Sequence, residues 1–571
     1  MPHPQTHYYQ VTLTVQGWQK EKLDLRFPVW TPGSYLVREY ERHLQEFNAI
    51  TPSQAQPFVW KKCAKNHWQV ETNNQTDLTI SYRLYANELT VRTNHLDDSH
   101  GFFTGAATFF FIPDFTHCPI TLTVVPPRSS WQVATTLPAK DVDQNTGAAT
   151  FWAEDFDTLV DCPVEVGEHT HKTFTVEGKP HHWVVWGEGN LNLEQLTKDT
   201  QKIIETEAEI FGGLPYEQYS FLLHLSNGGF GGLEHKESCV LNYRRFGFRE
   251  TESYQRFLRL VAHEFFHLWN VKRIRPIALE TFDYDQENYT PSLWFSEGVT
   301  SYYDQLIPLR AGLMTRREFL ASFSKEITRL LTTPGRQIQP LAESSYDAWI
   351  KLYRRDANSP NSQISYYLKG EMVALLLDLT IRDRHDNQRS FDDVLRQLWQ
   401  TFGKSETGFT PEQLEACITN IADQDLTAIF HKFLHTTEEL PLAEWLERFG
   451  LKLQARQGES PPWLGISVKG EGQWTKITSV MSDSPAAQAG ITPGDILLAI
   501  GQFRVTAEQL GTRLKDYQPN DMIQVTVFNQ DRLRTVNIAL APPQATHFEL
   551  VPLKQPNATQ QRNLTGWLGE A

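Results

Sequence analysis

Two histidines four residues apart, His263 and His267, lie within an apolar run and most restrict how this chain can fold. Apolar residues recur at helical spacing over 257–269, which predicts a helix. Side chains four positions apart project from one face of a helix. The two imidazoles can therefore bind one metal ion, and Glu264 between them can reach a water molecule on that ion. This residue pattern is typical of hydrolytic zinc sites.

A hydrolytic zinc site needs three protein ligands and one open position, so a third ligand is expected further along the chain. Two glutamates compete for this role. Glu287 lies in a polar stretch that is typical of a loop. Glu297 lies in an apolar, aromatic segment that predicts a buried second helix, where a carboxylate needs a cation nearby. We expect His263, His267 and Glu297 to bind the metal, with Glu287 as the alternative.

The stretches 263–276 and 293–298 together resemble the glycyl aminopeptidase family, PDZ-bearing zinc peptidases of the gluzincin clan that are distant relatives of aminopeptidase N. In aminopeptidase N relatives the third ligand lies closer to the second histidine, at the place that Gln286 holds here. The resemblance implies one Zn2+ per chain. It also implies an aminopeptidase that prefers small N-terminal residues, glycine and alanine.

A glycine-rich segment, 227–235, follows a strand-like run. Glycines let an extended peptide approach an edge strand closely, so Gly231 and Gly232 are expected to contact the substrate. A simple turn between two strands is the alternative. By the resemblance, Glu234 pairs with the free α-ammonium group of a substrate, which distinguishes an aminopeptidase from an endopeptidase.

The segment 365–371 opens a long apolar helix. In aminopeptidase N relatives, a tyrosine two residues before Lys-Gly donates a hydrogen bond to the oxyanion, which points to Tyr367. Such a neutral phenol stabilises charge that develops only near the transition state. Tyr366 is the alternative, and without the resemblance either tyrosine would be interpreted as a core aromatic residue.

The C-terminal part of the chain resembles a PDZ domain of the bacterial protease type. Its signals are short strands and a helix with Ser484 as its cap and Pro485 at its start. The backbone amides near Leu464, Gly465 and Ile466 are expected to receive the C-terminal carboxylate of a bound peptide. A static scaffold without a ligand is the alternative.

The segment 30–40 resembles the N-terminal β domain of the family, and alternation over 9–15 and 78–84 predicts strands there. The residues from Thr410 begin a helix, with Pro411 in its first position. We therefore predict a multidomain α+β protein. Its parts are an N-terminal β-sandwich-like domain over 1–170, a thermolysin-like catalytic domain over 171–332, an α-helical domain over 333–452, a PDZ domain over 453–545 and a C-terminal tail over 546–571.

The composition of the chain excludes some classes of partner and indicates its cellular location. A formal net charge of −15 and a pI near 5.7 argue against nucleic acid and anionic membranes as partners. The 5 cysteines are scattered and odd in number, which is typical of free thiols rather than a disulfide framework. The start of the sequence has no secretion signal, and no apolar run is long enough to span a bilayer, so we expect a cytoplasmic protein. The oligomeric state stays unknown at this stage.

These patterns together predict hydrolysis of the first peptide bond of peptides with a free N-terminus. Glu264 is expected to act as general base on a zinc-bound water, and Tyr367 as the oxyanion donor. Three alternatives stay open. They are an endopeptidase with the same zinc, a metallohydrolase acting on another small molecule, and a non-catalytic PDZ adaptor whose peptide binding would survive chelation.

Overall fold

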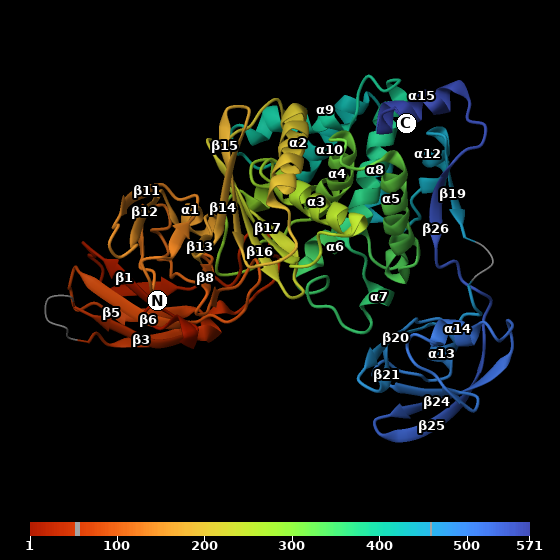
Figure 1. Ribbon diagram of the computed structural model, residues 1–571, viewed down its shortest axis with the longest axis horizontal. Coiled ribbons are helices and arrows are strands. Elements are labelled where there is room, and N and C mark those ends of the chain that lie inside the picture. The colour runs from red at the N-terminus through yellow and green to blue at the C-terminus, as the bar shows by residue number, and fades with distance from the viewer. Residues whose placement is uncertain (52–56, 457–459, 571) are drawn as a thin grey trace. The chain divides into compact units, whose positions relative to one another are not determined.

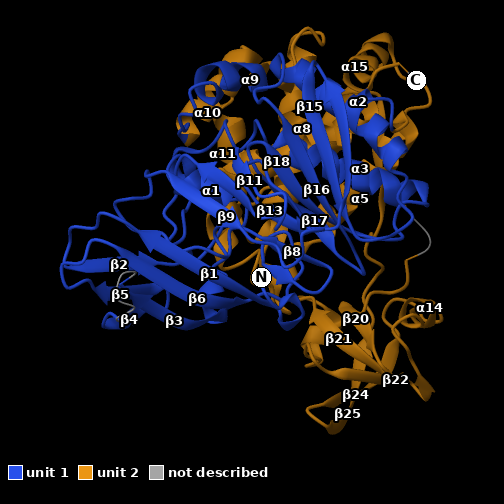
Figure 2. Cartoon of the chain, turned by 60° about the vertical axis from the view of Figure 1, so that its left-hand side comes forward, with its two compact units in different colours: residues 1–290, 310–313, 395–410 blue, residues 291–309, 314–394, 411–571 orange. Residues whose placement is uncertain are grey.

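A computed structural model describes residues 1–51, 57–456 and 460–570. Positions 457–459 of the predicted PDZ domain and 571 of the predicted tail lie outside the described residues. The chain, drawn with its elements labelled in Figure 1, divides into two compact units, which Figure 2 shows in different colours. Unit 1 comprises 1–290, 310–313 and 395–410, and unit 2 comprises 291–309, 314–394 and 411–571.

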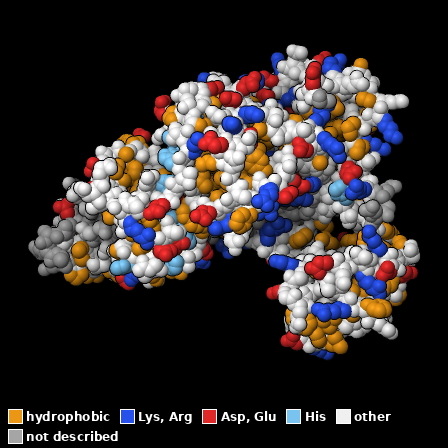
Figure 3. Space-filling model, in the orientation of Figure 1, with side chains coloured by type: hydrophobic (Ala, Val, Ile, Leu, Met, Phe, Trp, Pro, Cys, Tyr) orange, Lys and Arg blue, Asp and Glu red, His pale blue; other side chains and the backbone are white. Residues whose placement is uncertain are grey.

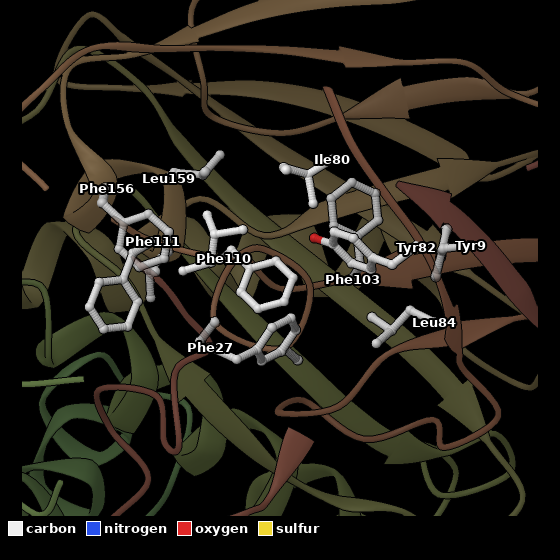
Figure 4. Close-up of a cluster of buried hydrophobic side chains, with 14 of the residues drawn as sticks. Tyr9, Phe27, Ile80, Tyr82, Leu84, Phe103, Phe110, Phe111, Phe156 and Leu159 are labelled. Carbon is white, nitrogen blue, oxygen red and sulfur yellow. The ribbon is translucent and has the colours of Figure 1, made fainter. Parts of the chain in front are cut away.

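The N-terminal part of unit 1 is built of small antiparallel sheets around an aromatic core (Figure 4). Several of its strands alternate buried and half-exposed side chains, and on one of them the buried residues are Leu78, Ile80, Tyr82 and Leu84. The elements are β1 (Tyr8–Val15), β2 (Lys22–Arg26), β3 (Leu44–Ile50), β4 (Trp60–Ala64), β5 (His67–Glu71), β6 (Leu78–Tyr85), β7 (His95–Leu96), β8 (His100–Phe103), β9 (Ile120–Val124), β10 (Gln132–Ala134), β11 (Ala139–Val142), β12 (Ala149–Ala153), α1 (Phe156–Asp161) and β13 (Val164–Gly167).

A second sheet in unit 1 has the order β14-β15-β16-β18-β17. Its three central strands are parallel, and the last strand, β17, is antiparallel to its neighbour and forms an edge. Helix α3 packs against β17 and β18. The elements are β14 (Thr170–Val176), β15 (Lys179–Trp186), α2 (Leu193–Phe211), β16 (Tyr219–Ser226), β17 (Phe230–Glu234), β18 (Ser238–Arg244) and α3 (Thr251–Phe266).

Helix α3 ends earlier than its apolar periodicity predicts. The expected helix runs to Trp269, whereas α3 ends at Phe266 and the chain turns there. His267 keeps helical backbone angles, so both histidines still share one face. The early end lets the next backbone carbonyl groups turn back toward the histidine ring.

Unit 2 is helical around α8, whose side chains are buried on every face from Leu368 to Arg382. Helices α5, α6, α10, α12 and α15 pack on it. Ser365 caps α8, and α10 begins at Pro411 as predicted. The helices between residues 291 and 448 include the π-helical segment η4 (Trp294–Val299), α4 (Thr300–Arg310), α5 (Arg316–Leu331), α6 (Leu341–Tyr346), α7 (Ser359–Ser362), α8 (Tyr366–Arg384), α9 (Phe391–Leu398), α10 (Pro411–Ala422), α11 (Thr427–His435) and α12 (Leu442–Arg448).

The C-terminal part of unit 2 is a β-rich fold with its own apolar core. Ser484 caps its short helix, as predicted. The elements are β20 (Ile466–Glu471), β21 (Trp474–Val480), α13 (Pro485–Gln488), β22 (Ile496–Ile500), β23 (Phe503–Arg504), α14 (Leu510–Leu514), β24 (Met522–Asn529) and β25 (Arg532–Ala539).

The last residues return to the helical region. Strand β26 (Phe548–Pro552) pairs with β19 (Leu451–Ala455), so the two ends of the PDZ-like segment are joined by a ladder. Helix α15 (Ala558–Leu568) then packs on α8, where Trp567 donates a hydrogen bond of 2.8 Å to the Tyr302 hydroxyl. The predicted tail therefore contains regular structure.

The architecture is a mixed α+β chain with a β-rich N-terminal part, a helical middle and a β-rich C-terminal part, which confirms the predicted fold class. On the face shown in Figure 3, acidic and basic side chains are interspersed. Among the described residues, no helix is long and apolar enough to cross a membrane.

Candidate active site

The two histidines of the metal motif lie together on α3 in unit 1. The ring centroids of His263 and His267 are 4.6 Å apart, with the rings nearly perpendicular at 89°. His267 is buried and His263 is half-buried. The expected helical spacing therefore brings both imidazoles to one place, with one of them reaching solvent.

The backbone carbonyl of Asn270 orients His267. It lies 2.6 Å from Nδ1 of that ring, so Nδ1 carries the proton and donates to it. This leaves the Nε2 lone pair of His267 available to a metal, as in many metal-binding histidines. This partner could not be predicted from local patterns, because any residue supplies a carbonyl and only the turn after α3 directs it to the ring.

Glu264 lies against the edge strand β17. Its side chain is 5% exposed, and a Cβ atom built at Gly232 would lie 2.2 Å from its Oε1 atom. A larger residue at this contact between strand and helix would force the Glu264 side chain to move. Gly231 and Gly232 thus belong to β17, and not to the turn of the alternative interpretation. The carbonyl of Gly232 accepts a hydrogen bond of 2.9 Å from Arg92.

Glu234, at the end of β17, lies in unit 1 close to Glu264 and His267. Glu234, Glu264 and His267 each offer a ligand atom, and these atoms lie within 4.8 Å of one another. Glu234 is only 4% exposed, and its Oε1 atom has no hydrogen-bond partner among the described residues. Burying a carboxylate oxygen without a hydrogen-bond partner costs free energy. A cationic ligand at Glu234 would offset this cost.

An N-terminal turn supports Glu234 from the other side. A Cβ atom at Gly33 would lie 2.6 Å from both carboxylate oxygens of Glu234, and Gly33 has a φ of +82°. Trp30 and Tyr35 from the same turn line a cavity beside Glu234. The segment 30–40, from which we predicted only the N-terminal β domain, therefore lies against Glu234, a candidate binding residue.

Glu297 lies in unit 2, in the π-helical segment η4, and is 2% exposed. Single π turns inside helices are frequent at functional sites. A Cβ atom at Gly298 would lie 2.5 Å from the Cα atom of Gly370, so η4 and α8 cross at two glycines. Glu287 lies in unit 1 and is in none of the candidate metal-binding groups of the described residues, and the choice between Glu297 and Glu287 as third ligand stays a prediction.

Tyr367 lies at the start of α8 in the same unit. Its hydroxyl is 3.0 Å from that of Tyr353, which is also 3.0 Å from the hydroxyl of Tyr366. Tyr366 is fully buried, whereas Tyr367 keeps part of its surface. Burial and the nearby charge of Glu297 raise the pKa of Tyr367 well above its usual value, so its phenol stays protonated and able to donate. Tyr353 was not among the site residues predicted from the sequence.

An ion pair stabilises the chain that follows the metal motif. Nζ of Lys272 lies 2.6 Å from Oδ1 of Asp161, and both side chains are largely buried. Burial alone would raise the pKa of Asp161, but Lys272 and His235 hold it below the usual range. Asp161 therefore stays ionised and ties the end of α1 to the turn after α3.

The candidate carboxylate loop of the PDZ-like fold precedes and enters β20 in unit 2. Gly465 has a φ of +84°, and a Cβ atom there would lie 2.0 Å from Cβ of Ser484. The carbonyls of Leu464 and Gly465 accept hydrogen bonds of 3.1 and 2.9 Å from the α13 region. Peptide binding at Leu464, Gly465 and Ile466 stays a prediction.

Family models match three parts of the chain. They are the Peptidase M61 N-terminal domain over residues 1–168, M61 glycyl aminopeptidase over 256–373 and PDZ domain over 462–540. No curated protein sequence matches the chain.

Solved structures are similar as well. An aminopeptidase N family protein from Idiomarina loihiensis is 30% identical, with a TM-score of 0.93, covering 100% of this chain and 98% of that one. An M1 zinc metallopeptidase from Deinococcus radiodurans is 15% identical, covers 76% of this chain and 90% of that one, and has a TM-score of 0.46. Yeast LTA4 hydrolase in complex with bestatin is 12% identical, covers 77% and 67%, and has a TM-score of 0.46.

The metal motif on α3, the three family models and the full-length similarity to the Idiomarina protein agree with one another. The chain therefore belongs to the M61 glycyl aminopeptidase family and is a zinc metallopeptidase with a C-terminal PDZ domain.

Proposed function

We propose that this zinc aminopeptidase removes N-terminal residues from peptides and prefers small ones, glycine and alanine. The observation that carries the proposal is the buried carboxylate of Glu234, which lacks a hydrogen-bond partner on Oε1 among the described residues and lies beside Glu264 and His267. A free α-ammonium group is the cation that such a pocket fits. The family name supports the preference for small residues.

The proposed zinc ligands are His263, His267 and Glu297, with one ion per chain. Two imidazoles and one carboxylate are a donor set that hydrolytic zinc sites use, and the Asn270 carbonyl already fixes the required tautomer of His267. When bound, zinc supplies a Lewis acid that polarises the scissile carbonyl and acidifies water.

The chain's own groups perform the remaining steps. Glu234 pairs with the substrate ammonium, which places the first peptide bond beside Glu264. Glu264 takes a proton from the attacking water as the oxygen bonds to the carbonyl carbon. It then gives the proton to the leaving amine nitrogen as the C–N bond breaks. Tyr367 donates its phenolic proton in a hydrogen bond to the oxyanion.

The edge strand β17 supports the orientation of the peptide. An extended substrate can add beside an edge strand through main-chain hydrogen bonds, and a Cβ atom at Gly231 would meet nothing within 4 Å. Arg92 already binds the Gly232 carbonyl, so we expect the substrate to pair with the other groups of the strand.

The test compares Glu234→Gln with the wild type on glycyl-, alanyl- and leucyl-arylamides and their N-acetylated forms. We expect the variant to lose about 100-fold or more in kcat/KM on free-amine substrates, since a buried charge pair is worth roughly 3 kcal/mol or more. Glu41→Gln is the matched control, because Glu41 is also a buried carboxylate without a hydrogen-bond partner among the described residues. Unchanged activity of Glu234→Gln, or cleavage of N-acetylated substrates, would move the assignment to an endopeptidase.

A further inference from the structure

Three buried side chains with metal-binding chemistry lie together outside the proposed catalytic site. They are His100, Glu165 and His224, each no more than 1% exposed. Each offers one ligand atom, and these atoms lie within 4.8 Å of one another. The residues come from β8, β13 and β16, all in unit 1.

The hydrogen bonds of this cluster are incomplete. Nε2 of His224 lies 2.8 Å from Oε2 of Glu165, which is a good hydrogen bond. Nε2 of His100 lies 3.9 Å from Oε1 of Glu165, which is too long for one. Both ring nitrogens of His100, Oε1 of Glu165 and Nδ1 of His224 have no hydrogen-bond partner among the described residues.

Buried polar atoms without hydrogen-bond partners lower the stability of the fold unless another group binds to them. A neutral imidazole always carries one N–H donor, so the buried ring of His100 holds an unpaired donor or an unpaired acceptor on each nitrogen. Each such atom costs about 1–3 kcal/mol relative to its solvated state. A cation placed between His100 and Glu165 would bind an imidazole nitrogen of His100 through its lone pair. It would also neutralise the carboxylate of Glu165.

We propose that His100, Glu165 and His224 bind a second divalent transition-metal ion, with Zn2+ as the ion that this donor set suits best. Two imidazole nitrogens and one carboxylate oxygen are preferred zinc ligands. Atoms bound to zinc at about 2.0–2.1 Å lie roughly 3.3 Å apart in a tetrahedron. The 3.9 Å separation between His100 and Glu165 would then close by about 0.6 Å (3.9 − 3.3), and the 2.8 Å contact between His224 and Glu165 would open by about 0.5 Å (3.3 − 2.8).

The surroundings of His100 fit a closed site. The ring of Trp186 stacks on it, with centroids 3.6 Å apart and planes 17° apart. Oδ1 of Asp97 lies 3.8 Å from Nδ1 of His100, which is too long for a hydrogen bond but places a carboxylate charge beside the ring. Asp97 is itself held by the backbone amide of Ser99 at 2.8 Å.

The position of the ion indicates its role. Strands β8 and β13 belong to one sheet, and β16 belongs to the sheet whose edge strand β17 carries Glu234. An ion bound here would join the N-terminal β part to the sheet that receives the substrate. Because the cluster is fully buried, this ion serves stability rather than catalysis.

The experiment removes the catalytic zinc first. The full-length chain with His263→Ala and His267→Ala is equilibrated with zinc, desalted and analysed for metal content. We expect it to retain about one zinc per chain, and we expect Glu165→Gln with His224→Asn in this background to remove that zinc. His181→Asn is the matched control, since His181 is a buried histidine that already bonds Tyr216 at 2.8 Å.

A second measurement leaves the cluster intact, so a variant that fails to fold does not weaken the test. X-ray absorption at the zinc edge of the His263→Ala, His267→Ala chain should show imidazole nitrogen and carboxylate oxygen as ligands. Dialysis against a chelator should lower the melting temperature of this chain. A chain that retains no zinc overturns the proposal, and so does zinc that survives the Glu165→Gln and His224→Asn changes.

Discussion

Replacing Gly232 by alanine should displace the proposed general base without removing any functional group. The added Cβ atom would lie 2.2 Å from Oε1 of Glu264, and ordinary contact begins at 3.4 Å, so the carboxylate must move by 1.2 Å (3.4 − 2.2). A misplacement of about 1 Å can cost roughly 100-fold in rate, which is about 2.7 kcal/mol of transition-state stabilisation. We therefore expect kcat to fall about 100-fold.

The assay is steady-state hydrolysis of glycyl- and alanyl-arylamides, with the zinc content measured on the same samples. Zinc binding should be unchanged, and KM should change little, because Glu234 stays in place. Gly228→Ala is the control, since a Cβ atom there meets nothing within 4 Å and its backbone is unstrained. Wild-type kcat in Gly232→Ala would refute the placement of Glu264 as the base.

Two further predictions concern an oxyanion donor and an ion pair. Tyr367→Phe should lower kcat by about 100- to 1,000-fold with little change in KM, whereas Tyr366→Phe should stay near wild type, and equal losses would reject Tyr367 as the donor. Lys272→Met should lower the free energy of unfolding by about 3 kcal/mol in urea denaturation, because it leaves Asp161 buried without its cation. Since the folded-state pKa of Asp161 is lowered, its contribution is present above about pH 4 and is lost as the pH falls below that value, so the difference between wild type and variant should shrink on acidification. A difference that does not depend on pH would contradict this reasoning.

Local patterns in the sequence predicted the parts of the molecule that local physics decides. The periodicity around His263 and His267 predicted a helix that carries both rings on one face. Ser484 caps a helix at the predicted position, and α8 begins within the predicted segment 365–371, because helix starts depend on a few adjacent residues. The end of α3 was misplaced, since apolar residues continue past Phe266 while the chain already turns.

Contacts between segments that are distant in the sequence could not be predicted from local patterns. Nothing near Gly33 in the sequence indicates that it lies against Glu234, and the Asn270 carbonyl becomes a partner of His267 only through the turn after α3. The buried histidine and glutamate residues of β8, β13 and β16 each resemble an isolated polar residue in a core strand. Only the packing of two sheets brings them together.

The role of zinc and Glu264 is measured by the hydrolysis of aminoacyl-arylamides and their N-acetylated forms by the wild type and Glu264→Gln. The metal content is determined before and after chelation. We expect that the wild type cleaves only free-amine substrates, that chelation abolishes and zinc restores this activity, and that Glu264→Gln retains catalytic zinc without turnover. Cleavage that persists in Glu264→Gln, or in a chain free of metal, would contradict it.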